Sequence, residues 1–112
     1  MKTVTISVSS PEETRQRFLA AAKGKAQGAH ISFPSVELLW KVLAPKRMAL
    51  VRALTGAGAV SIREAARRVN RDVRAVHSDV TALINAGVLN RADGGIEFPY
   101  EAVHVDFILK AA

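Results

Sequence analysis

Two short amphipathic segments joined by a brief link constrain the fold of this chain more than any other feature. Within residues 62–69, apolar side chains recur at helical spacing: Ile62, Ala65, Ala66 and Val69. In the second segment, which follows Asp72, the apolar positions also fall within one arc of a helix: Val73, Val76, Val80, Leu83 and Ile84. This spacing predicts two amphipathic helices that pack against each other across a short turn.

Capping signals bound both predicted helices. Ser61, with Glu64 three residues later, predicts a capping box at the start of the first helix. Residues 70–71 are expected to turn the chain, Asp72 to cap the second helix, and Gly87 to end it in a left-handed conformation.

A hairpin is predicted directly after the second helix. Residues 88–91 and 96–98 are typical of strands, and residues 92–95 between them contain the Asp-Gly-Gly sequence of a tight turn. A further helix is expected to precede the pair, over residues 45–55. Helix, short helix, longer helix and hairpin together predict a winged helix-turn-helix over residues 45–98.

The N-terminal third predicts two strands and two helices. Residues 2–8 alternate polar and apolar side chains, which favours a strand. Ser10 and Glu13 form another capping box, and the helix after them is expected to reach Lys23. Its apolar side is formed by Phe18, Leu19 and Ala22. Three segments follow: a polar connection at residues 24–28, a short strand at 30–33, and a helix at 36–43 that Ser35 caps.

The C-terminal residues alternate as well, and after a turn at residues 100–102 they predict a strand with one apolar face: Val103, Val105, Phe107 and Leu109. Strands at opposite ends of the chain indicate a sheet outside the winged helix. Two arrangements fit. The favoured one is a homodimer built from the N-terminal strand and helix, which sets two recognition helices one DNA turn apart. In the other, both strands complete one sheet within a single chain.

The fold class that we expect is α+β, mainly α, and 112 residues suit one ordinary domain. Residues 1–34 would form an N-terminal strand–helix extension that dimerises. Residues 35–112 would form the winged helix-turn-helix DNA-binding domain with the C-terminal strand.

The positive charge is concentrated in one third of the chain. The net charge is +6, yet residues 41–77 alone carry nine basic side chains against Glu64 and Asp72. The basic residues are Lys41, Lys46, Arg47, Arg52, Arg63, Arg67, Arg68, Arg71 and Arg74. Such a cluster is typical of proteins that bind a polyanion, although by charge alone a solvated basic surface is an equal alternative.

DNA recognition by such a fold assigns contacts to the second helix first. A helix fits the major groove, and its first exposed residues meet base edges. Arg71 and Arg74 are placed for bidentate bonds to guanine. His77 and Ser78 are within reach of bases or phosphates, and Thr81 lies on the same arc.

Phosphate contacts are expected from the flanking elements. The helix start at Ser61 offers free backbone N–H groups to a phosphate. Four cationic side chains are expected to neutralise the DNA backbone: Lys46, Arg47, Arg67 and Arg68. Arg91 flanks the hairpin tip, within reach of the minor groove or the backbone.

These segments resemble a family of small bacterial and archaeal winged-helix transcriptional regulators. The resemblance is carried by the run Ser61–Leu83, by residues 87–89, and by a lead-in at residues 33–47, and it covers about residues 33–109. It implies operator binding, dimerisation, and the role of antitoxin in a type II toxin–antitoxin pair that represses its own operon. Related repressors carry Arg or Lys at the position of Ser78, so the chain departs from the family pattern there.

Composition disfavours several other classes of protein. The chain has no cysteine, which excludes disulfides and zinc fingers and fits a cytoplasmic location. It contains no apolar run of about 20 residues and no signal-peptide pattern, so we expect no membrane association. No nucleophile–base pair or phosphate-binding glycine loop is recognisable, so we expect neither enzyme activity nor a cofactor. His77 with Asp79, and His104 with Asp106, offer metal-binding atoms, but paired surface side chains are the favoured interpretation.

Three rival functions remain open. The basic face of a winged-helix scaffold could bind an acidic protein instead of DNA. An RNA-binding domain is disfavoured because aromatic residues, the usual stacking platform for bases, make up only 5% of the chain. A ligand-responsive regulator would need an effector pocket, for which 112 residues leave little room.

Overall fold

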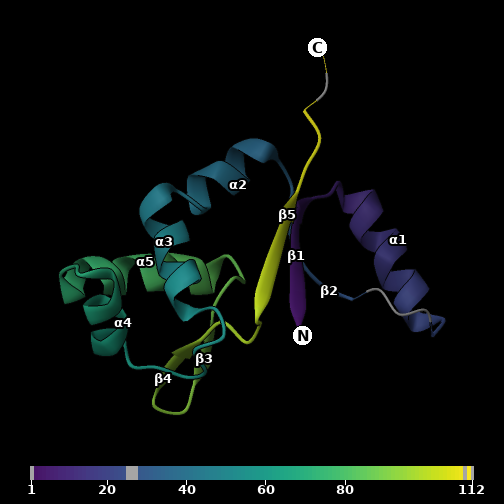
Figure 1. The fold of residues 1–112 in the computed structure, drawn as a ribbon. Helices are drawn as coiled ribbons and strands as arrows, with labels where there is room; N and C mark the ends of the chain where they lie inside the picture. The colour runs from purple at the N-terminus through teal and green to yellow at the C-terminus, as the bar shows by residue number, and fades with distance from the viewer. Residues whose placement is uncertain (1, 25–27, 110, 112) are drawn as a thin grey trace.

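The computed structural model describes residues 2–24, 28–109 and 111 and has an α+β fold (Figure 1). In chain order the elements are β1 (Thr3–Val8), α1 (Pro11–Ala22), β2 (Ala29–Phe33), α2 (Val36–Val42), α3 (Pro45–Leu54), α4 (Ile62–Val69), α5 (Val73–Asn85), β3 (Asn90–Ala92), β4 (Gly95–Glu97) and β5 (Ala102–Asp106). Every expected helix and strand is present, with ends that differ by up to three residues. Residues 25–27 of the expected polar connection lie outside the described residues.

Three parallel strands form a sheet in the order β2-β1-β5. Alternate side chains of a strand share a face. One face of this sheet packs against the core through the buried side chains of Val4, Ile6 and Phe33. In Figure 1 the sheet stands between α1 and the other helices. The strands from the two ends of the chain thus complete one sheet within a single chain, as in the second arrangement considered above. Because β1 has neighbours along both edges, β1 cannot pair with a second copy, whereas dimerisation itself stays a prediction.

The helices α3, α4 and α5 pack around a common apolar core. Its members include Leu50, Val51 and Leu54 of α3, Ala65 and Ala66 of α4, and Val76, Val80 and Leu83 of α5. For α4 and α5 the buried positions lie on the faces that helical spacing predicts, except that Val73, expected on the apolar arc of α5, is 42% exposed in the first turn. Gly87, with a φ of 80°, follows the end of the last helix as expected. The following residues, Val88 and Leu89, are buried beneath the helices before β3 begins.

The hairpin β3–β4 is anchored to the segment that precedes α4. Val60 donates its N–H to the carbonyl of Ile96 at 2.9 Å, and Ile96 donates to Val60 at 2.8 Å. Gly95 lies directly against this bridge, because a β carbon there would come 1.9 Å from the carbonyl oxygen of Val60. Val60 therefore pairs with β4 along the edge that β3 leaves free. No pattern in the sequence predicts this contact.

The apolar side expected of α1 is not buried, and Phe18 is 72% exposed. The sheet face toward this helix is polar, since Thr5 and Ser7 alternate with the buried positions of β1. Arg17 joins the helix to this region by donating to Ser9 Oγ at 2.9 Å and Ser32 Oγ at 3.0 Å. Polar contacts therefore attach α1, in place of the expected apolar packing.

The C-terminal strand is shorter than expected. It ends at Asp106, which is opposite Ser7, so β1 has almost no residues left to pair with those that follow. Leu109, expected on the apolar face, is 77% exposed. Trp40 is also 55% exposed and packs edge-on against Phe107 with ring centroids 5.4 Å apart.

Candidate nucleic-acid interface

The turn between α4 and α5 is built by local hydrogen bonds. Asn70 adopts a left-handed conformation, with φ 54° and ψ 51°, which Asn tolerates better than most residues. The N–H of Arg71 then returns to the carbonyl of Ala66 at 3.0 Å. Asp72 caps α5 by accepting the N–H of Arg74 at 3.0 Å. The sharp turn sets α5 against α4 with a defined orientation.

The arc of α5 opposite its buried positions faces solvent, as helical spacing predicts. Arg74, His77 and Ser78 are exposed, whereas Thr81 is partly buried. Thr81 donates its hydroxyl to the carbonyl of His77 at 2.9 Å, which leaves only its oxygen lone pairs for a ligand. Within the described residues the Arg74 side chain has no hydrogen bond or ion pair, so its guanidinium is available to a partner.

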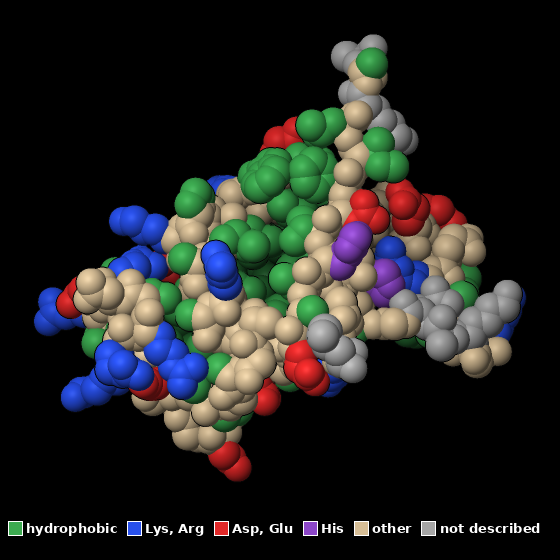
Figure 2. Space-filling view, viewed as in Figure 1, with side chains coloured by type: hydrophobic (Ala, Val, Ile, Leu, Met, Phe, Trp, Pro, Cys, Tyr) green, Lys and Arg blue, Asp and Glu red, His purple; other side chains and the backbone are tan. Residues whose placement is uncertain are grey.

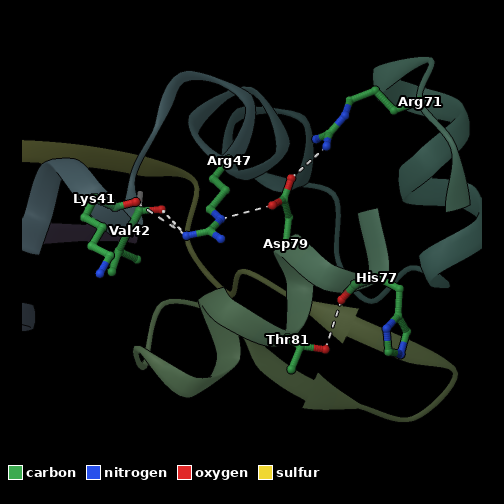
Figure 3. A network of polar contacts seen from close by, with 7 residues as sticks. All are labelled: Lys41, Val42, Arg47, Arg71, His77, Asp79 and Thr81. Carbon is green, nitrogen blue, oxygen red and sulfur yellow. Dashed lines mark hydrogen bonds and ion pairs between the residues drawn. The ribbon is translucent and has the colours of Figure 1, made fainter. Parts of the chain in front are cut away.

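Asp79 lies beside this arc and organises a network of arginines (Figure 3). Its carboxylate accepts from Arg47 Nε at 3.0 Å and pairs with Arg71 Nη2 at 2.8 Å. Arg47 also donates to the carbonyl of Val42 at 3.4 Å and, weakly, to that of Lys41. One carboxylate on α5 thereby joins the end of α2, the start of α3 and the α4–α5 turn.

This network changes the roles expected for Arg47 and Arg71. Their side chains are only 26% and 20% exposed, and Arg71 Nη1 is buried without a hydrogen-bond partner in the described residues. Burial raises the pKa of Asp79, but the hydrogen bonds and charges of the two arginines outweigh it and hold the pKa below its ordinary value. Both arginines are engaged in holding the helices together, so neither projects freely toward a groove.

At the start of α4 the expected capping box forms only in part. Ser61 Oγ accepts the N–H of Glu64 at 3.0 Å, but the carboxylate of Glu64 turns to Arg67 instead of returning to the cap. Arg67 Nε lies 2.8 Å from both carboxylate oxygens, and Arg68 Nε lies 3.8 Å from one. The hydrogen bond from Arg67 lowers the pKa of Glu64, so this group stays ionised and offsets part of the positive charge.

Six exposed cations between residues 41 and 91 have no side-chain hydrogen bond or ion pair within the described residues: Lys41, Lys46, Arg52, Arg63, Arg74 and Arg91. Arg63 was not among the expected contact residues. It lies four positions before Arg67 and therefore on the same exposed side of α4, a spacing that could have identified it. Figure 2 shows Lys and Arg side chains gathered at the end of the molecule where α4 lies.

Metal-binding clusters and membrane-spanning helices are both absent from the described part of the chain. It holds no group of three or more His, Asp or Glu side chains able to bind a metal ion. None of the helices between residues 2 and 109 is both long and apolar enough to cross a membrane.

The fold and this surface define a small α+β protein in which two packed helices carry unpaired arginines beside a hairpin. The family model HVO_A0114 matches residues 42–105, more than half of the chain, and the chain belongs to the HVO_A0114 family. The match begins just before α3 and ends within β5. No curated protein and no solved structure is significantly similar to the chain.

Proposed function

We propose that this chain is a sequence-specific DNA-binding transcriptional regulator of the winged helix-turn-helix class. The observation that carries the proposal is the exposed arc of α5, where Arg74 stands unpaired in the first turn of a helix whose opposite face is buried. A helix presented in this way fits the major groove with its first residues against base edges.

The hairpin supports the winged form of the motif. Val60 precedes α4 and pairs with Ile96, so this isolated bridge anchors the two-stranded hairpin beside the two helices. The tip of such a hairpin can reach DNA next to the groove that a recognition helix occupies. Arg91, which is exposed on β3, is the cation placed for that contact.

The proposed contacts divide into three groups. Arg74 reads bases, while His77 and Ser78 contact bases or phosphates further along the groove. Phosphates are bound by the backbone N–H groups near Ser61 and by cations on α3 and α4: Lys46, Arg63, Arg67 and Arg68. Arg47 and Arg71 are positioning residues, because through Asp79 they fix how α5 is presented.

The regulatory role that we propose is repression of the chain's own operon as the antitoxin of a toxin–antitoxin pair. The support for this part is the resemblance of residues 33–109 to antitoxin-type regulators. Co-expression with the product of the neighbouring gene tests it: a stable complex that abolishes toxicity of that product is expected. A neighbouring product that is harmless alone would contradict it.

A gel-shift titration with the DNA directly upstream of the gene tests DNA binding. We expect a shifted band that persists with excess scrambled competitor and weakens as salt rises, since phosphate contacts release counterions. Equal competition by scrambled DNA, or no band at low salt, would contradict the proposal and favour a scaffold that binds an acidic protein.

A further inference from the structure

The strand β5 has one edge without a neighbour in the described residues, because the sheet order is β2-β1-β5. Ala102 donates its N–H toward β1, to the carbonyl of Lys2 at 3.4 Å. Backbone groups of successive strand residues point to alternate sides, so the N–H and C=O of Val103 and Val105 face the open edge. Proteins usually protect such an edge with proline, lysine or a bulge, and residues 102–106 contain none of these.

The apolar face of β5 continues into a groove. Val103 lines it together with residues of α3, mainly Pro45, Met48, Ala49 and Val51, and its volume is about 700 Å³. Val105, on the same face, is 38% exposed, although it lies opposite the buried Ile6. Figure 2 shows a hollowed apolar area over this part of the molecule, between α3 and β5.

The other face of β5 carries a basic and an acidic side chain. His104 and Asp106 are both exposed, with His104 Nε2 lying 3.9 Å from Asp106 Oδ2. When a strand pairs antiparallel with its own copy across a two-fold axis, the residue numbers of any two opposed residues add up to the same value. A pairing centred on Val105 therefore sets His104 opposite Asp106 of the second copy, twice.

We propose that the open edge of β5 is a homodimer interface in which two copies pair antiparallel, centred on Val105. In this register Val105 exchanges both backbone hydrogen bonds with its symmetry mate, and Val103 meets Phe107 of the second copy beside the α3 groove. A register centred on His104 is also compatible with the backbone. It sets His104 against itself and leaves Asp106 opposite Ala102, so it lacks the charge complementarity.

The interface differs from the one expected from the N-terminal strand, because β1 is interior to the sheet. It joins two three-stranded sheets into one of six strands and gives the open edge of β5 backbone hydrogen-bond partners. Opposite charges directly across a strand pair stabilise it, and like charges destabilise it. The proposal does not depend on DNA binding, so either can fail while the other stands.

Sedimentation velocity of the full chain across the micromolar range tests the proposal. We expect a reversible dimer, and Val105→Pro should make it monomeric, because proline removes the N–H that faces the partner. That N–H does not bond to β1, so the circular dichroism spectrum and thermal transition of the variant should stay close to those of the wild type.

A charge-swap series tests the register. His104→Asp places like charges opposite each other twice and should raise the dimer Kd by about tenfold. In the Val105-centred register, the double variant His104→Asp with Asp106→His again sets an aspartate opposite a histidine at both positions. It should therefore recover the dimer. In the His104-centred register it would place two aspartates together and should stay weak.

Three results would overturn the proposal. A wild-type chain that stays monomeric across this range would show that the edge does not pair with its own copy. A dimer that survives Val105→Pro would place the interface elsewhere. Failure of the folded double variant to recover dimerisation would exclude the Val105 register.

Discussion

At the residue scale, the carboxylate of Asp79 holds two neighbouring arginines in ion pairs and so keeps their side chains from projecting into solvent. It binds Arg47 and Arg71 at 3.0 and 2.8 Å and is itself only 15% exposed. Two of the cations in the basic cluster thereby become structural. The unpaired Arg74, two residues into α5, is left as the arginine that faces solvent from the same helix.

Asp79→Asn should destabilise the fold at neutral pH. The substitution removes the charge that two partly buried arginines face, and losses of about 1–3 kcal/mol are typical when such a charged hydrogen bond is broken. Urea unfolding measures the effect. Glu12→Gln, which removes a carboxylate from an exposed pair with Arg15, is the control and should cost less than about 0.5 kcal/mol.

The effect of Asp79→Asn should depend on pH in one direction. The folded-state pKa of Asp79 lies below its ordinary value of 3.8, so the stabilisation is complete above that value. It is lost as the pH falls through the folded-state pKa. The difference in unfolding free energy between wild type and variant should therefore be constant near neutrality and shrink in acid. A difference that grows in acid would contradict this account of Asp79.

At the element scale, the helices were predictable and the contacts between distant segments were not. Ser10, Pro45 and Gly87 are local signals, and each marks a helix end within two residues of the observed one. The pair Arg47–Asp79 spans 32 residues of sequence, and no local pattern encodes it. The Val60 bridge was missed for the same reason, since a single paired residue has no periodicity.

Gly95→Ala should weaken the attachment of the hairpin to the helices. Its β carbon would overlap the backbone of Val60 and Ser61, so the bridge between Val60 and Ile96 must open. We expect a loss of about 2–4 kcal/mol in unfolding free energy, within the range of severe single substitutions. Gly94→Ala is the control: it meets no atom within 4 Å, and its φ of 83° should cost only about 1 kcal/mol. Equal losses for the two variants would argue against the bridge.

Arg63→Ala tests whether the exposed side of α4 contacts phosphates. A phosphate contact carries no sequence information, so binding to operator and scrambled DNA should weaken by similar factors. The slope of log K against log salt should flatten by about 0.9, which is the change expected when the protein neutralises one phosphate fewer. An unchanged slope would remove Arg63 from the interface.

At the scale of the whole molecule, the two ends of the chain meet in one sheet, which stands between α1 and the other helices (Figure 1). The pairing of β1 with both β2 and β5 places the N-terminal segment inside the same sheet as the C-terminal strand. Alternation of side chains predicted the two terminal strands, but it does not specify strand order. The order is what leaves β5, and not β1, with an open edge.

Fluorescence anisotropy with the upstream DNA and a scrambled duplex, at two salt concentrations, tests the central claim that α5 reads bases through Arg74. The wild type should prefer the upstream DNA. Arg74→Ala should lose about 1–3 kcal/mol of that preference while its affinity for scrambled DNA changes much less. Arg15→Ala, an equal change of charge on α1, should leave the preference intact. If Arg74→Ala keeps the wild-type preference, or if the wild type has none, α5 is not the recognition helix.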